Sequence, residues 1–165
     1  MVKVYRDFQY AKKFINKSTV AIGNFDGVHL GHLSLLKKAK KLASNSNTSF
    51  TILTFAPHPL KILRPEFEPK SILRFRTKIE MLERAGVEIV LAQRFTKSFS
   101  KITAEKFVYD VLKNGLKAKN IVVGDDFRFG YKREGDVSYL VSEEFSEMFK
   151  VHIIDEISGK YGRIQ

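Results

Sequence analysis

The 165-residue sequence contains no cysteine. Disulfides, thiolate catalysis and cysteine-based zinc sites are therefore excluded within it, and a cytoplasmic location is favoured. The N-terminal stretch lacks the apolar core of a signal peptide, and no apolar run approaches the length of a membrane span. Internal repeats and low-complexity segments are missing as well. We expect one cytoplasmic domain, 1–165, which is large enough to bury a hydrophobic core without stabilising cross-links.

Basic residues outnumber acidic ones by 29 to 18, which gives a formal net charge of +11. Such a charge can indicate nucleic-acid binding. Here the lysines are spread along the chain in pairs, such as Lys37-Lys38 and Lys40-Lys41, and no aromatic–basic motif of a nucleic-acid module accompanies them. A phosphate-rich small molecule also suits this charge. We therefore expect small-molecule substrates, with nucleic acid unlikely and no membrane partner.

Short apolar segments alternate with amphipathic ones along the chain. The pattern predicts strands at 18–22, 50–55, 87–91, 121–123 and 151–154, and helices at 33–43, 71–85, 103–114 and 137–149. Thr103 is the expected N-cap of the third helix, and 60–70 is expected to be a loop. This alternation predicts an α/β fold with a doubly wound parallel sheet, in which ligands bind beyond the carboxyl ends of the strands.

The strongest local signal is the stretch 20–36, where an apolar strand enters a glycine-punctuated turn and the turn enters an amphipathic helix. Glycines let the backbone approach a ligand, and free N–H groups at a helix start favour an anion. His29 and His32 lie where the turn becomes helix and add side-chain donors. The sequence therefore predicts a nucleotide-binding, catalytic turn.

Two other interpretations of this turn are weaker. Neither the P-loop pattern nor G-x-G-x-x-G is present. Histidines three residues apart also suit a metal, with Asp26 or His58 as a third ligand, but no H-E-x-x-H motif or carboxylate–histidine cluster accompanies them. Phosphate binding is favoured over metal binding.

Two further loops follow predicted strands, at 56–59 and 124–130. In the first, two prolines hold His58 in a restricted, extended backbone. In the second, Phe127 and Phe129 also suit a core, and Arg128 also suits an ion pair. Because all three loops follow parallel strands, we expect them to converge at one edge of the sheet.

Together the three loops resemble a known family. The segment G-N-F-D-G-V-H-L-G-H at 23–32 is similar to the G-x-F-D-G-V-H-x-G-H signature of the bacterial FMN adenylyltransferase (FAD synthetase) domain. The segment T-F-A-P-H-P at 54–59 is similar to its T-F-x-P-H-P, and V-G-D-D-F-R-F-G at 123–130 to its V-G-x-D-F-R-F-G. That domain belongs to the H-x-G-H nucleotidyltransferase superfamily. In most bacteria it is the N-terminal half of a bifunctional riboflavin kinase/FMN adenylyltransferase.

The resemblance implies a Rossmann-like sheet of the nucleotidyltransferase type and the reaction FMN + ATP → FAD + pyrophosphate, with Mg²⁺. It implies direct attack of the FMN phosphate on the α-phosphorus of ATP, with His29 and His32 as the catalytic donors. The implied ATP-binding residues are Gly23, Asn24, Phe25, Asp26, His29, Gly31 and His32. The residues implied to bind FMN or assist the metal are Pro57, His58, Asp126, Phe127 and Arg128. Of these, Asp126 is the candidate Mg²⁺ ligand.

The sequence departs from the family pattern in two places. Ala56 stands where many members carry an acidic residue before P-H-P. If that carboxylate helps to hold the metal, Asp126 or water must take its place. Members also carry an S-S-T-R-I-R-like segment after the last strand, whereas this sequence reads D-E-I-S-G-K-Y-G-R-I-Q at 155–165. We expect the domain to end before that motif, without a riboflavin kinase domain, and the activity to be reduced.

FMN adenylyltransferase is thus the leading hypothesis, and three alternatives remain open. One is another H-x-G-H nucleotidyltransferase with a different phosphorylated acceptor, which the V-G-x-D-F-R-F-G loop argues against. A second is a non-catalytic flavin- or nucleotide-binding remnant, which the C-terminal departure motivates. The third is nucleic-acid binding through the basic surface.

Overall fold

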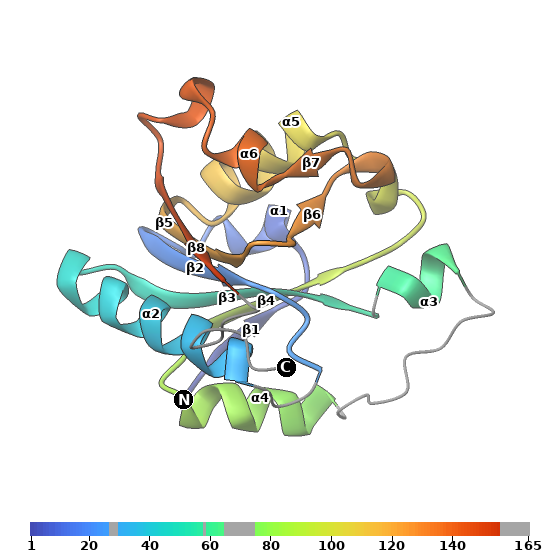
Figure 1. Cartoon of the computed structure of the whole chain (residues 1–165). Coiled ribbons are helices and arrows are strands. Elements are labelled where there is room, and N and C mark those ends of the chain that lie inside the picture. Colours follow the sequence, from blue (N-terminus) through green and yellow to red (C-terminus); the bar gives the residue numbers. More distant parts are fainter. Residues whose placement is uncertain (27–29, 58, 65–74, 156–165) are drawn as a thin grey trace.

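The computed structural model describes residues 1–26, 30–57, 59–64 and 75–155 (Figure 1). Their centre is a six-stranded sheet in the order β1-β4-β3-β2-β5-β8, and every neighbouring pair is parallel. The strands are β1 (Lys3–Tyr5), β2 (Ser18–Ile22), β3 (Ser49–Ala56), β4 (Ile89–Arg94), β5 (Ala118–Gly124) and β8 (Lys150–Ile154). The predicted α/β fold with a doubly wound parallel sheet is confirmed.

Helices cover both faces of the sheet (Figure 1). One face carries α2 (Leu30–Ser46) and α4 (Phe75–Arg84), and the other carries α1 (Phe8–Ala11), α5 (Ala104–Lys106), η2 (Phe107–Gly115) and α6 (Val137–Leu140). A small antiparallel pair, β6 (Arg128–Phe129) and β7 (Gly135–Asp136), lies beside α5 and α6. The remaining elements are short: α3 (Pro59–Leu63), η1 (Phe99–Lys101), η3 (Tyr131–Arg133) and η4 (Glu143–Phe145).

Strand β2 lies at the middle of the sheet, and all five of its residues are buried. Its side chains alternate between the two faces because successive residues of a strand point in opposite directions. Val20 and Ile22 join the cluster under α1 and η2, whereas Ala21 joins the cluster under α2 and α4. The near-continuous apolar run 20–22 is therefore explained by helices on both sides of the strand.

Two predicted elements need correction. The expected loop 60–70 contains the short helix α3, and residues 65–70 lie outside the described part. The expected single helix 137–149 is wrong, because the chain forms only α6 and the 3₁₀ turn η4 there. Val141, on the proposed apolar face, is 52% exposed. Two short turns bury the other apolar side chains of this stretch without a continuous helix.

The helix predicted over 103–114 is present but changes its winding. Thr103 is its N-cap, and the Thr103 hydroxyl accepts a hydrogen bond from the Lys106 N–H at 3.1 Å. From Phe107 onward the helix continues as the wider π-helical stretch η2. Its buried face packs on the sheet. None of the described helices combines the length and the apolar character that a membrane crossing requires.

Replacing the cap should destabilise the domain measurably. We expect Thr103→Ala to lower the free energy of unfolding by about 1 kcal/mol, because the first turn of α5 loses its side-chain acceptor. The matched control is Ser98→Ala, since Ser98 precedes η1 without a side-chain cap bond. Urea denaturation measures both. Equal stabilities of the two variants would contradict the assigned cap.

Candidate functional site

The strand order places the candidate site at a reversal point of the sheet. From β2 the chain proceeds to β3 and β4 on one side, whereas β5 and β8 lie on the other side. In open α/β sheets the carboxyl ends of the strands that flank such a reversal form the ligand crevice. Residues 23–26, 56–57 and 125–127 all follow the carboxyl ends of adjacent parallel strands. For the described residues, the expected convergence of the three loops is confirmed.

Gly23 begins the turn but does not offer its N–H to a ligand. That N–H donates to the Leu53 carbonyl at 3.1 Å and continues the pairing of β2 with β3. The Gly23 N–H is therefore not among the free donors of the turn. The glycine has another role, because a Cβ at this position would lie 3.2 Å from the Phe25 ring. Its lack of a side chain lets that ring fold back under the turn.

Phe25 lies under the turn and has no exposed surface. The ring is fully buried and packs 5.1 Å from the His32 ring, measured between centroids. The Phe25 φ angle is 54°, in a region that bulky residues seldom adopt. For the N–H groups of Asn24 and Phe25, the described part of the chain provides no acceptor. An N–H left without an acceptor is costly, so these two groups are the candidate backbone donors for an anion bound against the turn.

The Asn24 carbonyl is held from two sides. The Thr54 hydroxyl donates to it at 3.2 Å, and the Lys78 ammonium donates at 2.7 Å. The same ammonium forms an ion pair with Asp26 at 3.0 Å. Asp26, expected to bind ATP, is therefore engaged by Lys78. This pairing also disfavours Asp26 as a metal ligand.

Sequence reasoning missed Lys78. A lysine on an amphipathic helix normally lies on the solvated face, and α4 carries several charged residues. The available signal was its spacing from Leu82, since residues four apart share a helix face. Both side chains are buried against the sheet.

The Asn24 side chain carries a buried acceptor. Its Oδ1 makes no hydrogen bond to the residues that the structure describes. A buried acceptor left unpaired is costly, so a bound molecule that presents an N–H or O–H would be stabilised there. The oxygen and nitrogen of this amide are distinguished only by their hydrogen bonds, so a rotated amide would present a donor instead.

The predicted histidines are only partly described. His32 lies half-buried in the first turn of α2, next to Phe25. Gly31 lies in the same turn. His29 and His58, predicted as a catalytic donor and as an FMN- or metal-side group, lie outside the described residues. Pro57 is exposed just after β3, where the Ala56–Pro57 peptide bond is cis.

The loop after β5 combines core and surface residues. Phe129 is buried and packs on Phe107 at 5.1 Å, while Phe127 is partly buried and stacks on Phe129 at 5.3 Å. Arg128 lies 3.8 Å from Asp136, in a half-exposed pair that contributes little stability. The alternatives of a core role for Phe129 and an ion pair for Arg128 therefore hold. Asp126 is exposed.

The described residues contain no group of three or more His, Asp or Glu side chains placed to hold a metal ion. A magnesium ion usually needs only one or two carboxylates, because it keeps several waters and binds substrate phosphates. The exposed Asp126 carboxylate at the reversal point fits that limited requirement.

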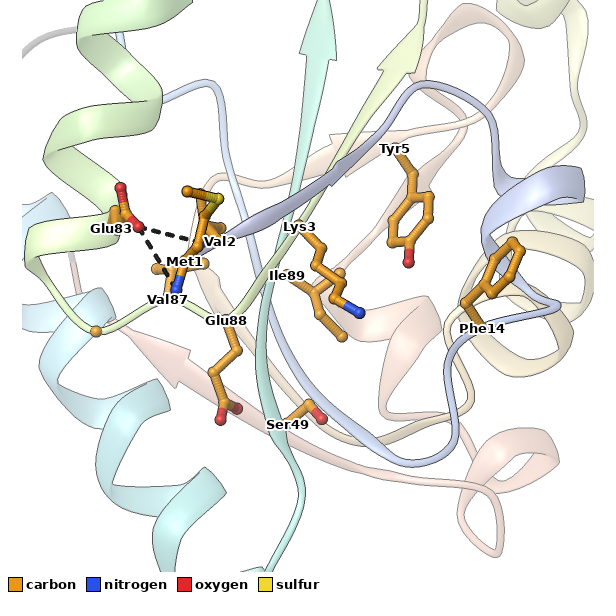
Figure 2. Close-up of a pocket in the computed structure, with 11 residues that line it drawn as sticks. Met1, Val2, Lys3, Tyr5, Phe14, Ser49, Glu83, Val87, Glu88 and Ile89 are labelled. Atoms are coloured by element: carbon orange, nitrogen blue, oxygen red, sulfur yellow. Dashed lines mark hydrogen bonds and ion pairs between the residues drawn. The ribbon is translucent and has the colours of Figure 1, made fainter.

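A hollow of about 550 Å³ lies elsewhere on the molecule (Figure 2). It is lined by β1 and by the first residues of β3 and β4, with Glu83 bonded to the Val2 N–H at 3.1 Å. This is the amino-terminal edge of the strands, opposite the turn 23–26. Its position argues against a part in the candidate site.

Comparison with known proteins identifies the family of this chain. The sequence model of the FAD synthetase family matches residues 11–165. A bifunctional riboflavin kinase/FMN adenylyltransferase from Buchnera aphidicola subsp. Schizaphis graminum is 39% identical over 159 residues, which cover 96% of this chain and 51% of the relative. The protein of that name from Escherichia coli K12 is 41% identical over 117 residues, 71% of this chain and 37% of the relative.

A similar fold occurs in a crystal structure described as a macrolide-efflux protein from Streptococcus pneumoniae. It superposes with a TM-score of 0.81 at 27% identity, covering all of this chain and 55% of that one. The chain thus spans about half the length, or less, of the curated relatives it matches. The family match over 11–165, with relatives up to 41% identical, shows that this chain belongs to the FAD synthetase family.

Proposed function

We propose that this domain is an FMN adenylyltransferase that transfers AMP from ATP to FMN, giving FAD and pyrophosphate. The observation that carries the proposal is the turn 23–26 at the reversal point of the sheet, with the family signature continuing into α2. The names of the relatives, which include FMN adenylyltransferase, support the choice of acceptor.

In the proposed reaction, an oxygen of the FMN phosphate forms a bond to the α-phosphorus of ATP. The bond from that phosphorus to the bridging oxygen of the β-phosphate breaks, and pyrophosphate leaves with the electron pair. No covalent enzyme intermediate is needed, so the protein contributes positioning and charge stabilisation. The N–H groups of Asn24 and Phe25, the amino end of α2, and the His32 imidazole are proposed as donors to the triphosphate.

The other predicted site residues are assigned by their place around this turn. His29 is proposed as the second catalytic donor, and Gly23, Asp26 and Gly31 as residues that shape the ATP site. On the flavin side, the proposal assigns Pro57 and His58 after β3. It also assigns Phe127 and Arg128 after β5, where Phe127 is the partly buried member of the ring pair that it forms with Phe129.

Magnesium is proposed to accompany ATP. The Asp126 carboxylate is proposed as its protein ligand, because magnesium prefers oxygen ligands such as carboxylates. When bound, the ion neutralises negative charge on the phosphates. Asp126, which follows β5, would then hold the ion or one of its waters.

A direct assay tests the function. The protein is incubated with FMN, ATP and MgCl₂, and FAD and pyrophosphate are measured separately. Riboflavin, which lacks the attacking phosphate, and nicotinamide mononucleotide serve as acceptor controls. Formation of FAD and pyrophosphate in equal amounts supports the proposal. ATP or FMN binding without pyrophosphate would instead favour a binding module, and faster reaction with another acceptor would favour a different nucleotidyltransferase.

We expect His32→Ala to reduce turnover by roughly 10²–10³-fold, the scale for loss of one preorganised donor in a phosphoryl-transfer site. The control is His152→Ala, since His152 lies on β8 and contacts Asn120 rather than the turn. Steady-state FAD formation measures both variants. A His32→Ala rate within twofold of wild type would remove His32 from the mechanism.

Asp126→Asn should raise the Mg²⁺ concentration needed for half-maximal FAD formation. About tenfold is expected, the lower end of the range for lost support of a metal. Asp125→Asn is the matched control, because Asp125 is the adjacent exposed carboxylate. A magnesium titration at saturating ATP and FMN makes the comparison. If the two variants shift the titration equally, Asp126 has no special part in metal binding.

A further inference from the structure

Lys78 is a buried lysine with a specific set of partners. It is 5% exposed, although Arg76 and Glu80 on the same helix are exposed. Lysines are almost never fully buried unless they are paired, because removing an ammonium from water is costly. The side chain shares the sheet-facing side of α4 with Leu82. Its charge must therefore be stabilised by contacts within the protein.

Among the described residues, both polar partners of Lys78 lie in the turn after β2. The ammonium donates to the Asn24 carbonyl at 2.7 Å and pairs with Asp26 at 3.0 Å. Hydrogen bonds to charged groups are stronger than neutral ones. Lys78 thus connects α4 to a turn more than fifty residues earlier in the sequence.

The bond to the Asn24 carbonyl fixes the direction of the next N–H. A trans peptide unit is planar, and its C=O and N–H point in opposite directions. Lys78 and Thr54 both donate to the Asn24 oxygen, so the Phe25 N–H is directed away from them. The Phe25 φ of 54° accompanies this orientation. Such a backbone persists in a bulky residue only where its surroundings enforce it.

We propose that Lys78 is a positioning residue that aims the Phe25 N–H at a nucleotide phosphate. Lys78 does so through the Asn24 carbonyl, and its own charge is balanced by Asp26. Without the ammonium, the peptide between Asn24 and Phe25 is free to rotate toward an unstrained φ, and the donor is lost. This role rests on the proposed function for the identity of the nucleotide.

The test compares Lys78→Met with wild type. Methionine keeps the length of the side chain and removes the charge. We expect both the ATP affinity, measured by calorimetry, and kcat/KM for FAD formation to fall about tenfold to a hundredfold. This effect does not exceed the loss expected for one preorganised donor. In wild type, Mg-ATP should also shift the amide NMR signal of Phe25. In folded Lys78→Met protein that shift should disappear. A loss of stability alone would leave the shift in the protein that remains folded.

Two variants of α4 control for charge and stability. Arg76→Met removes the same charge from the exposed side of the helix and should leave ATP affinity within twofold. Leu82→Ala empties a buried position one turn farther along the helix, so it should lower the melting temperature while folded protein keeps its affinity. If Lys78→Met lowers only the melting temperature, as Leu82→Ala does, or binds ATP within twofold of wild type, the proposal is overturned.

If Lys78→Met does not fold, Thr54→Val reports on the same carbonyl, because it removes the other donor without adding or removing charge. A reduced ATP affinity and a smaller Phe25 shift are expected, and unchanged values would overturn the proposal. Wild type that binds ATP but forms no FAD would refute the proposed function, while the binding and NMR results still decide the role of Lys78. Wild type that binds no ATP would refute both.

Discussion

The reversal of strand order between β2 and β5 is the constraint on which the candidate site depends. All neighbouring strands are parallel, so the loops that follow β2, β3 and β5 leave the same edge of the sheet. The chain turns toward opposite sides after β2 and β5, which is the arrangement that forms the ligand crevice in open α/β sheets. The buried β2 fixes where this reversal point lies. Segments around residues 24 and 126, a hundred positions apart in sequence, are thereby brought to one place.

The conformation of the turn 23–26 is determined by the side chains that pack against it. Phe25 fills the space under Gly23 and beside His32, while Thr54 and Lys78 hold the Asn24 carbonyl. A positive φ at a bulky residue costs about 1–3 kcal/mol. One hydrogen bond from a charged donor contributes about 1.5–3 kcal/mol. The two magnitudes are similar, so a single contact barely offsets the strain, and the ring packing and the second donor are needed as well.

Features with local signals were predictable from the sequence. Periodicity located β2, β3, β4, β5, β8 and the long helix α2, and a threonine before an apolar run identified the Thr103 cap. The helix expected over 137–149 failed because apolar spacing alone does not distinguish one helix from two short turns that bury the same side chains. The hydrogen bond of the Gly23 N–H and the burial of Lys78 could not be predicted, for another reason. Their partners, Leu53 and Asn24, are supplied by tertiary contacts that local sequence patterns do not encode.

The pairing of Lys78 with Asp26 also bears on how the proposed site would handle phosphate charge. In a P-loop, a lysine of the loop itself reaches the phosphates. Here the buried lysine beside the turn is engaged by a carboxylate and a carbonyl of the turn, so its charge is already balanced within the protein. The donors left to face an anion are neutral backbone N–H groups, the amino end of α2 and imidazole. Oriented dipoles lose little free energy through reorganisation when charge develops, which suits the proposed reaction, whose main requirement is a fixed geometry around the α-phosphorus. A lysine that acts through the backbone suits such a site, because it orients the Phe25 N–H without itself contacting the phosphate.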